Sequence, residues 1–343
     1  TGKTPVVELL AKTLAARGRH VAILSRGYRS KPRPWFDRLR AAFANSTCGV
    51  ILMLTLAPWF DRLRAAFAKD YNAIPPKIVS DGKQVFLDSG EAGDEPFMLA
   101  RNLLAQNDRT GVAVVVDKNR VKGGKYAISH LQADTLLLDD GFQYIKLQPW
   151  LNVLLVDSTN PFHNHEPLPL GLLREPIKNL RRADFIFLTK SNGGNHLRHL
   201  RSFLKRHNPR AEIIECNHEP RHFQDVRSSE QVNLDYIRGK RVAALCAIAV
   251  PESFENYLTD LGATIVYRKR FVDHHRYRAH ELRDFINAAN KHHAEILVTT
   301  EKDAVRLPEL PAELPPFYFL RVEINILDGI EHFHRCITRI CLS

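Results

Sequence analysis

The sequence lacks a hydrophobic run long enough to cross a bilayer. A membrane-spanning helix needs about 18–20 apolar residues in succession, and the longest candidate, Val50–Pro58, has roughly half that length. No signal peptide is recognisable, and the chain opens on Thr1 without a methionine. We therefore expect no transmembrane segment within these residues, and an upstream segment stays an open alternative.

Cysteine is scarce and scattered. The chain has five cysteines, an odd number, and no CxxC pair. Disulfide frameworks and zinc knuckles use paired or regularly spaced cysteines, so the pattern argues against both and favours a reducing compartment.

Basic tracts interleaved with aromatic residues, which stack on nucleic-acid bases, are also missing. The chain is nevertheless basic, with 49 Lys and Arg against 38 Asp and Glu and a net charge of +11. Such an excess favours an anionic partner, namely nucleic acid, acidic lipid headgroups or a phosphorylated substrate. The missing stacking tracts weaken the first of these.

The length and the hydrophobic pattern predict two α/β lobes. The chain has 343 residues, which corresponds to two domains at about 150 residues each. Short runs of Val, Ile and Leu alternate with helical patterns, as in a doubly wound, mostly parallel sheet covered by helices on both faces. Strands are predicted at 20–25, 111–117, 135–140, 152–157, 184–190, 211–216, 241–249, 264–271, 295–300 and 317–322, and helices at 4–17, 94–104, 120–131, 252–261, 279–291 and 329–342.

A polar stretch at 191–195 is the best linker between the lobes. We therefore expect a first domain at 1–190 and a second, smaller lobe at 191–343. In the first domain, an insertion at about 34–68 carries PWFDRLRAAFA twice, at 34–44 and 58–68. Each copy fits an amphipathic helix lying on a membrane; a local tandem duplication or sequence-assembly artefact in a loosely packed insertion is the favoured alternative.

The opening residues Gly2, Lys3 and Thr4, followed by Pro5 and a helical pattern, match the second half of a phosphate-binding loop, G-x-x-x-x-G-K-[ST]. In such loops backbone N–H groups at a helix start hold the phosphates, the lysine reaches the outer two, and the hydroxyl binds Mg²⁺. A four-residue match also occurs by chance, with a solvated lysine.

Carboxylates stand at two further positions suited to nucleotide chemistry. Asp139 and Asp140 end the apolar run 135–138, where such acids bind the Mg²⁺ of a nucleotide. Asp94 stands at a helix start, where it is alternatively a plain N-cap. Asp273-His274-His275 follows another apolar run; a His beside an Asp accepts or orients a proton, although a polar loop explains it equally.

Taken together, the motifs resemble the tetraacyldisaccharide 4'-kinase family of lipid A biosynthesis. The resemblance runs from the first residue to about Leu307 and rests on a series of motifs in order. They are Thr1–Pro5 (TGKTP), Ser25–Tyr28 (SRGY), Ser80–Gly82 (SDG), Ala92–Pro96 (AGDEP), Asp139–Gln143 (DDGFQ), Leu173–Pro176 (LREP), Asp273–His275 (DHH) and Thr300–Asp303 (TEKD).

The resemblance implies a P-loop kinase at the cytoplasmic face of the bacterial inner membrane. It would use ATP and Mg²⁺ to phosphorylate the 4'-hydroxyl of a tetraacylated glucosamine disaccharide 1-phosphate, with an anionic membrane surface as partner and no nucleic acid. By motif position it implies Asp94 and His274 as the catalytic pair, and Gly2, Lys3, Thr4, Asp139 and Asp140 at ATP, with Thr4 and Asp139 at the metal. Substrate or phosphate contacts would come from Arg26, Tyr28, Arg120, Gln143, Arg174 and Glu175.

The chain departs from the family pattern in several places. The glycine-rich first half of the loop and the family's hydrophobic amino-terminal helix are absent from this sequence, Tyr144 replaces a histidine, and Ala247–Pro251 (AIAVP) replaces GIGNP. Three alternatives therefore stay open: a P-loop kinase or NTPase acting on a soluble substrate, a basic nucleic-acid-binding protein switched by ATP, and an inactive fragment.

Overall fold

The computed structural model of the chain describes residues 2–27, 74–105, 110–162, 166–167, 170–171, 173–194, 197–311 and 313–342. Both copies of the repeated segment and Tyr28 lie outside these residues. By internal contacts the chain divides into two units, one comprising Thr1–Arg17 and Gly141–Ser343, the other Gly18–Asp140. Both units are α/β, in agreement with the predicted fold class.

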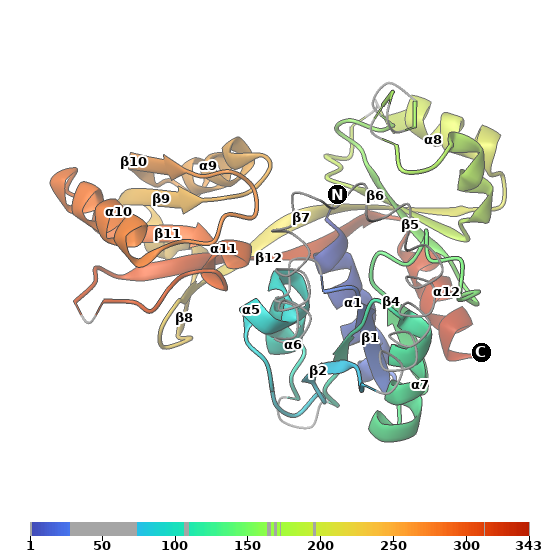
Figure 1. Cartoon of the computed structure of the whole chain (residues 1–343). Helices are drawn as coiled ribbons and strands as arrows, with labels where there is room; N and C mark the ends of the chain where they lie inside the picture. Colours follow the sequence, from blue (N-terminus) through green and yellow to red (C-terminus); the bar gives the residue numbers. More distant parts are fainter. Residues whose placement is uncertain are drawn as a thin grey trace, which may run out of the picture. The chain divides into compact units, whose positions relative to one another are not determined.

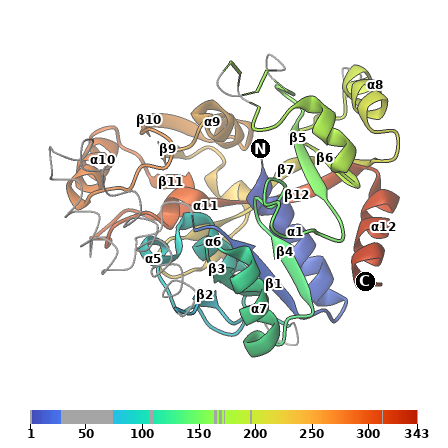
Figure 2. The same cartoon turned by 45° about the vertical axis from the view of Figure 1, so that its right-hand side comes forward.

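The unit Gly18–Asp140 contains a four-stranded sheet of order β2-β3-β1-β4. Its parallel strands are β1 (Val21–Ser25), β3 (Ala113–Val116) and β4 (Thr135–Leu138), and β2 (Lys77–Ser80) runs antiparallel to β3. Its helices are α5 (Ser89–Ala92), α6 (Asp94–Asn102) and α7 (Arg120–Leu131), which can be followed in Figure 2. Every residue of β1 and β3 is buried, which explains their unbroken apolar sequences.

Small residues let α7 pack closely on this sheet. Ala127 of α7 is fully buried among side chains of β1 and β3. A Cβ added at Gly124 would lie only 3.1 Å from Leu136 Cδ1 and 3.4 Å from Leu24 Cδ1. The helix begins where Asn119 accepts a hydrogen bond from the Lys122 N–H, a standard N-cap.

The larger unit contains an eight-stranded sheet of order β10-β9-β11-β12-β7-β6-β5, with β8 paired to β7. A long antiparallel pair, β7 with β12, joins two groups of parallel strands, and Figure 1 shows both strands running between the groups. The strands are β5 (Val153–Asp157), β6 (Phe185–Thr189), β7 (Glu212–Asp225), β8 (Gln231–Val232), β9 (Arg241–Cys246), β10 (Thr264–Arg270), β11 (Ile296–Thr300) and β12 (Phe317–Asp328). The helices are α1 (Lys3–Ala16), α8 (Leu197–His207), α9 (Pro251–Asp260), α10 (Ala279–Lys291), α11 (Glu301–Ala304) and α12 (Ile330–Cys341), with 3-10 turns at Ile177–Arg182 and Leu234–Ile237.

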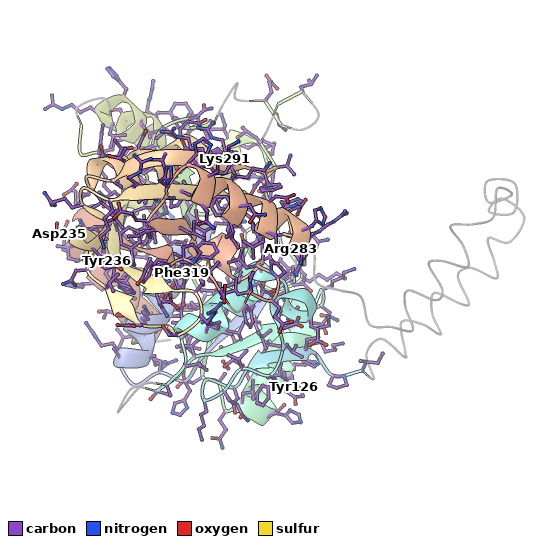
Figure 3. All side chains as sticks on the ribbon, turned by 90° about the vertical axis from the view of Figure 1, so that its left-hand side faces the viewer. Tyr126, Asp235, Tyr236, Arg283, Lys291 and Phe319 are labelled. Atoms are coloured by element: carbon purple, nitrogen blue, oxygen red, sulfur yellow. The ribbon has the colours of Figure 1, made fainter. Side chains whose placement is uncertain are left out.

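Successive strand residues pack alternately into hydrophobic clusters on opposite faces of this sheet. Val242 and Ala244 of β9 pack with α9, whereas Ala243 and Leu245 pack with α10. The buried stripe of α10 leaves charged residues such as Arg283 and Lys291 on its exposed side (Figure 3). None of the helices in the described part of the chain is both long and apolar enough to cross a membrane.

Two strands are longer than predicted. β7 continues to Asp225 and β12 to Asp328, whereas the sequence predicted ends at 216 and 322. Their distal halves are only partly buried and carry polar residues, so they lack the continuous apolar run by which the other strands are recognised. This pair joins the two groups of strands in one sheet, and residues 190 and 191 both belong to the larger unit. A domain boundary between them stays a prediction.

A buried cation joins three elements of the larger unit. Arg321 of β12 is 6% exposed and forms a salt bridge with Glu8 of α1. It also donates to both carboxylate oxygens of Glu301 in α11, at 2.7 and 2.6 Å. Lys12 adds a second cation, 2.7 Å from Glu8 and 3.2 Å from Glu323. Glu8 is itself 4% exposed, so the guanidinium neutralises a carboxylate that water cannot reach.

We predict that Arg321→Met lowers the free energy of unfolding by about 3–5 kcal/mol, because it removes the buried guanidinium from Glu301 and leaves Glu8 with Lys12 in its place. The matched control is Arg238→Met, since the pair Arg238–Asp235 has side chains 72% and 79% exposed; we expect a change of at most ~1 kcal/mol there. Urea unfolding of both variants measures the difference. Equal, small effects would contradict a stabilising role for Arg321.

Candidate active site

The start of α1 is a tight turn against the sheet of the larger unit. Gly2 has φ +72°, a conformation that favours glycine. A Cβ at this position would lie 2.6 Å from Cε1 and 2.7 Å from Nε2 of His218, and 3.7 Å from Cβ of Thr189. Lys3 and Thr4 open the helix, where backbone N–H groups have no partner within the helix and suit an anion. Gly2, Lys3 and Thr4 therefore form a helix start that suits an anion, and phosphate binding at this turn stays a prediction.

Two charged residues and one neutral histidine surround this turn. β5 and β6 are parallel, and their carboxyl ends carry Asp157 and Lys190, whose side chains form an ion pair at 2.6 Å. Burial tends to raise the pKa of the Asp157 carboxyl, but hydrogen bonds from Lys190 and Thr159 outweigh it and hold the pKa below its usual range. Burial, together with the positive charge of Lys190, lowers the pKa of His218 to about 4. The imidazole behind Gly2 is therefore uncharged at neutral pH.

In the smaller unit, the carboxyl edge of the parallel strands collects several predicted site residues. Ser25 is the last residue of β1, and Asp139 directly follows β4. The Ser25 hydroxyl donates to Oδ2 of Asp139 at 3.2 Å. Asp139 is 6% exposed, whereas Asp140 and Arg26 are exposed. Parallel strands place their carboxyl ends on one edge, where ligands of such sheets bind.

Asp94 and Arg120 lie toward the same edge, each at the start of a helix. Asp94 is the first residue of α6 and is 5% exposed; Arg120 is the first residue of α7 and is 4% exposed. Lys77, the register partner of the last residue of β3, donates from Nζ to the carbonyl oxygen of Glu91 at 2.7 Å. The chain just before Asp94 is thereby held near the carboxyl end of β3.

A further cluster links two of the motifs within the larger unit. Arg182 forms a salt bridge with Glu175, stacks on the ring of Phe142 at 4.2 Å, and donates to the Phe142 carbonyl oxygen at 3.2 Å. Gln143 follows Phe142 and Arg174 precedes Glu175, and both are exposed. Arg182 thus ties the predicted residues Gln143, Arg174 and Glu175 into one region.

The ring of His274 lies between two cations. Arg306 Nη2 is 3.0 Å from Nδ1, and Lys302 Nζ is 3.3 Å from Nε2. The backbone N–H of His274 donates to the carbonyl oxygen of Ala247 at 3.2 Å, and its φ is +64°. His275 differs, since its Nε2 lies 2.8 Å from Oε2 of Glu281 at the start of α10. His275 thus bonds to a carboxylate, whereas the ring of His274 faces two cations.

The predicted residues fall into both units. Gly2, Lys3, Thr4, Gln143, Arg174, Glu175 and His274 belong to the larger unit, and Arg26, Asp94, Arg120, Asp139 and Asp140 to the smaller one. Sequence reasoning missed the supporting residues Arg182, His218 and Arg306. The sequence offered a signal for Arg306, because it lies three residues after the TEKD motif. It offered none for Arg182 and His218, which stand outside every motif.

No group of three or more His, Cys, Asp or Glu side chains in the described ranges could hold a metal ion by itself. Mg²⁺ usually binds through one or two carboxylates together with substrate phosphates and water. Thr4 and Asp139 offer hydroxyl and carboxylate oxygens, the hard ligands that Mg²⁺ prefers.

The chain was compared with known proteins. A "Tetraacyldisaccharide 4'-kinase" from Anaeromyxobacter sp. (strain Fw109-5) is 36% identical over 333 residues, covering 96% of this chain and 76% of that protein. One from Syntrophus aciditrophicus is 33% identical over 340 residues, covering 95% and 77%. Among solved structures, LpxK from Aquifex aeolicus in complex with ATP matches with a TM-score of 0.65 and 25% identity, covering 99% of this chain and 84% of that one.

The model of the family described as "Tetraacyldisaccharide-1-P 4'-kinase" (LpxK) matches residues 1–53 and 69–341. The second copy of the repeated segment, 58–68, falls in the gap between the two matches. The resemblance inferred from the motifs is therefore confirmed, and the chain belongs to the tetraacyldisaccharide-1-phosphate 4'-kinase family.

Proposed function

We propose that this chain transfers the γ-phosphate of ATP to the 4'-hydroxyl of a tetraacylated glucosamine disaccharide 1-phosphate, a step of lipid A synthesis. The observation that carries the proposal is the family match over nearly the whole chain. The turn at Gly2 supports it, because it opens a helix whose first backbone N–H groups suit an anion such as phosphate.

In this proposal Gly2, Lys3 and Thr4 bind the ATP phosphates, with Asp139 and Asp140 near the nucleotide. Thr4 and Asp139 hold Mg²⁺, which would neutralise charge on the phosphates during transfer. Arg26, Tyr28, Arg120, Gln143, Arg174 and Glu175 contact the lipid headgroup or phosphate. Tyr28 lies outside the described residues, so its part rests on the motif alone.

Asp94 and His274 handle the proton of the acceptor in this proposal. The 4'-hydroxyl oxygen forms a bond to the γ-phosphorus, the bond from that phosphorus to the bridging oxygen breaks, ADP leaves, and the hydroxyl proton passes to the Asp94–His274 pair. The low exposure of Asp94 and the two cations beside His274 are consistent with groups held in fixed positions.

The net charge of +11 fits an acidic lipid surface as the place of reaction, at the cytoplasmic face of the inner membrane. The same charge would attract nucleic acid without sequence preference. We expect no tight nucleic-acid binding, because the chain lacks basic tracts interleaved with aromatic residues.

We predict that radiolabelled ATP and a detergent-dispersed disaccharide 1-phosphate lipid yield a product phosphorylated at the 4' position. The control acceptor carries a blocked 4'-hydroxyl and should remain unlabelled. Labelling of the blocked acceptor, or of a soluble sugar without lipid, would contradict the assignment of the substrate. Steep salt-dependent binding to random oligonucleotides would instead support the nucleic-acid alternative.

We predict that Asp94→Ala and His274→Ala each lower kcat by ~10²–10⁴-fold, the usual contribution of a general acid or base. Glu91→Gln and His275→Ala are the matched controls. Glu91 is an exposed carboxylate close to Asp94, and His275 is bonded to Glu281. Near-normal kcat in both Asp94→Ala and His274→Ala would show that neither residue takes part in the proton transfer.

His218 predicts a pH dependence of stability. Its pKa is about 4 in the folded chain and about 6.5 when unfolded. Between these values the unfolded chain binds a proton that the folded chain does not, so stability falls as the pH drops. Compared with His218→Gln, the native chain should lose up to ~3 kcal/mol more between about pH 6.5 and about pH 4. Urea unfolding across this range tests it; parallel profiles for the two proteins would show that His218 is not buried neutral behind Gly2.

A further inference from the structure

The His274 ring is held by a guanidinium that cannot move away. The Arg306 side chain is fully buried, and its Nη1 donates to Oδ1 of Asp303 at 3.2 Å and to the Ala247 carbonyl oxygen at 3.4 Å. This leaves Nη2 facing Nδ1 of His274 at 3.0 Å. The same Ala247 carbonyl oxygen accepts the backbone N–H of His274. Side chain and backbone of the histidine are thus fixed to one point of the fold.

Asp303 is what keeps the guanidinium in place. It has no exposed surface, and its Oδ2 accepts from the Ala247 N–H at 3.0 Å and from the Thr300 hydroxyl at 2.7 Å. With one oxygen on these two donors and the other on Arg306, the carboxylate has a single orientation. The TEKD motif therefore ends in a residue that orients Arg306, and through it His274.

The chemistry of Arg306 decides which nitrogen of His274 carries the proton. A guanidinium has only N–H donors and stays charged at all relevant pH values. Nδ1 must then be the acceptor, with its lone pair directed at Nη2. A neutral imidazole has one acceptor and one donor nitrogen, so the remaining proton is on Nε2.

Lys302 poses a conflict, because its ammonium also only donates and lies 3.3 Å from Nε2. A neutral ring cannot accept from both cations. The Lys302 side chain is 27% exposed, whereas that of Arg306 is 0% exposed. An Asp273 oxygen is 3.7 Å from the ammonium and the other is 3.8 Å from Nε2. Lys302 can therefore turn toward Asp273 or solvent, while Arg306 keeps its bond to Nδ1.

We propose that Arg306 is a positioning residue that fixes His274 as the neutral Nε2–H tautomer, so that the imidazole meets its reaction partner as a hydrogen-bond donor. The tautomer follows from contacts within the larger unit alone. Its consequence for turnover rests on the proposed function and narrows it: within the Asp94–His274 pair, Nδ1 is occupied and the ring has no lone pair for the acceptor's proton. The proton passes from the 4'-hydroxyl oxygen to the Asp94 carboxylate while the oxygen's electron pair forms the bond to the γ-phosphorus, and the bond from that phosphorus to the bridging oxygen breaks as ADP leaves.

The first test is nitrogen NMR of the ¹⁵N-histidine-labelled full chain at neutral pH. The His274 signal is assigned by its loss in His274→Asn. We expect a protonated Nε2 and an unprotonated Nδ1 in the native chain. His332 provides the opposite reference, because its Nδ1 lies 2.8 Å from the Ile213 carbonyl oxygen and must donate. A His274 ring protonated at Nδ1, or at both nitrogens, would overturn the proposal without any need for a variant.

The second test uses Arg306→Gln, whose amide can either donate to Nδ1 or accept from it, with Lys302→Met as the matched loss of the other cation. Arg306→Gln should give a mixture of tautomers, whereas Lys302→Met should leave Nε2–H in place. In the lipid-kinase assay Arg306→Gln should lower kcat by about 10- to 100-fold with both KM values unchanged. In a His274→Ala background it should have no further effect, because the two residues act as one unit. Additive losses would mean that Arg306 acts on folding or elsewhere.

The two tests separate this inference from the proposed function. A native chain that shows the Nε2–H tautomer but does not phosphorylate the lipid leaves the role of Arg306 intact and refutes the substrate. A chain that phosphorylates the lipid while His274 is protonated at Nδ1 refutes the inference alone.

Discussion

The bond between Arg321 and Glu8 is the contact on which the larger unit depends. Glu8 lies in α1, the helix that begins at Lys3, and Arg321 of β12 also binds Glu301, the second residue of the TEKD motif. Two residues further, Asp303 holds Arg306, which holds His274. The helix that carries Lys3 and the TEKD segment are therefore both attached to Arg321 of the sheet, and the loop that carries His274 is attached to Arg306 next to that segment. Because these charges are buried, each requires its partner in place, and the positions of both segments are narrowly defined.

Three histidines illustrate how surroundings assign different roles to one residue type. His218 is packed against Gly2 near Lys190, and burial with that positive charge keeps it neutral. His275 bonds to the Glu281 carboxylate and fastens a loop to α10. His274 accepts a hydrogen bond from Arg306 at Nδ1, and its other ring nitrogen, Nε2, lies on the side of Lys302. Motif position points to His274, and the ring partners of the two histidines also differ, since His274 faces two cations and His275 a carboxylate.

The elements that could be predicted from the sequence are those with a strong local signal. Strands such as β1, β3 and β6 are buried on both faces, so their apolar runs identify them without further information. The distal halves of β7 and β12 are stabilised by pairing with each other across about a hundred residues, a signal that no local window contains. The place of Asp139 directly after β4 was predictable because an apolar run precedes it, and its role as a ligand of the nucleotide stays a prediction. Arg182 and His218 were not predictable, because they act on Phe142 and Gly2, which lie 40 and 216 positions away. Arg306 lies 32 positions from His274, and only its place after the TEKD motif marks it in the sequence.

The groups around His274 indicate which catalytic groups act as hydrogen-bond donors in phosphoryl transfer and which one accepts a proton. The transferred group carries negative charge on its oxygens, so most catalytic groups are expected to be donors and cations. The Nε2–H of His274 and the ammonium of Lys302 lie on the same side of the ring, and both donate. Such a pair stabilises a carboxylate or phosphate oxygen and is poorly suited to remove a proton from a sugar. A carboxylate has the opposite property, since it only accepts when ionised. In the proposed reaction the acceptor's proton therefore passes to a carboxylate, which Asp94 supplies, and the imidazole acts as a hydrogen-bond donor.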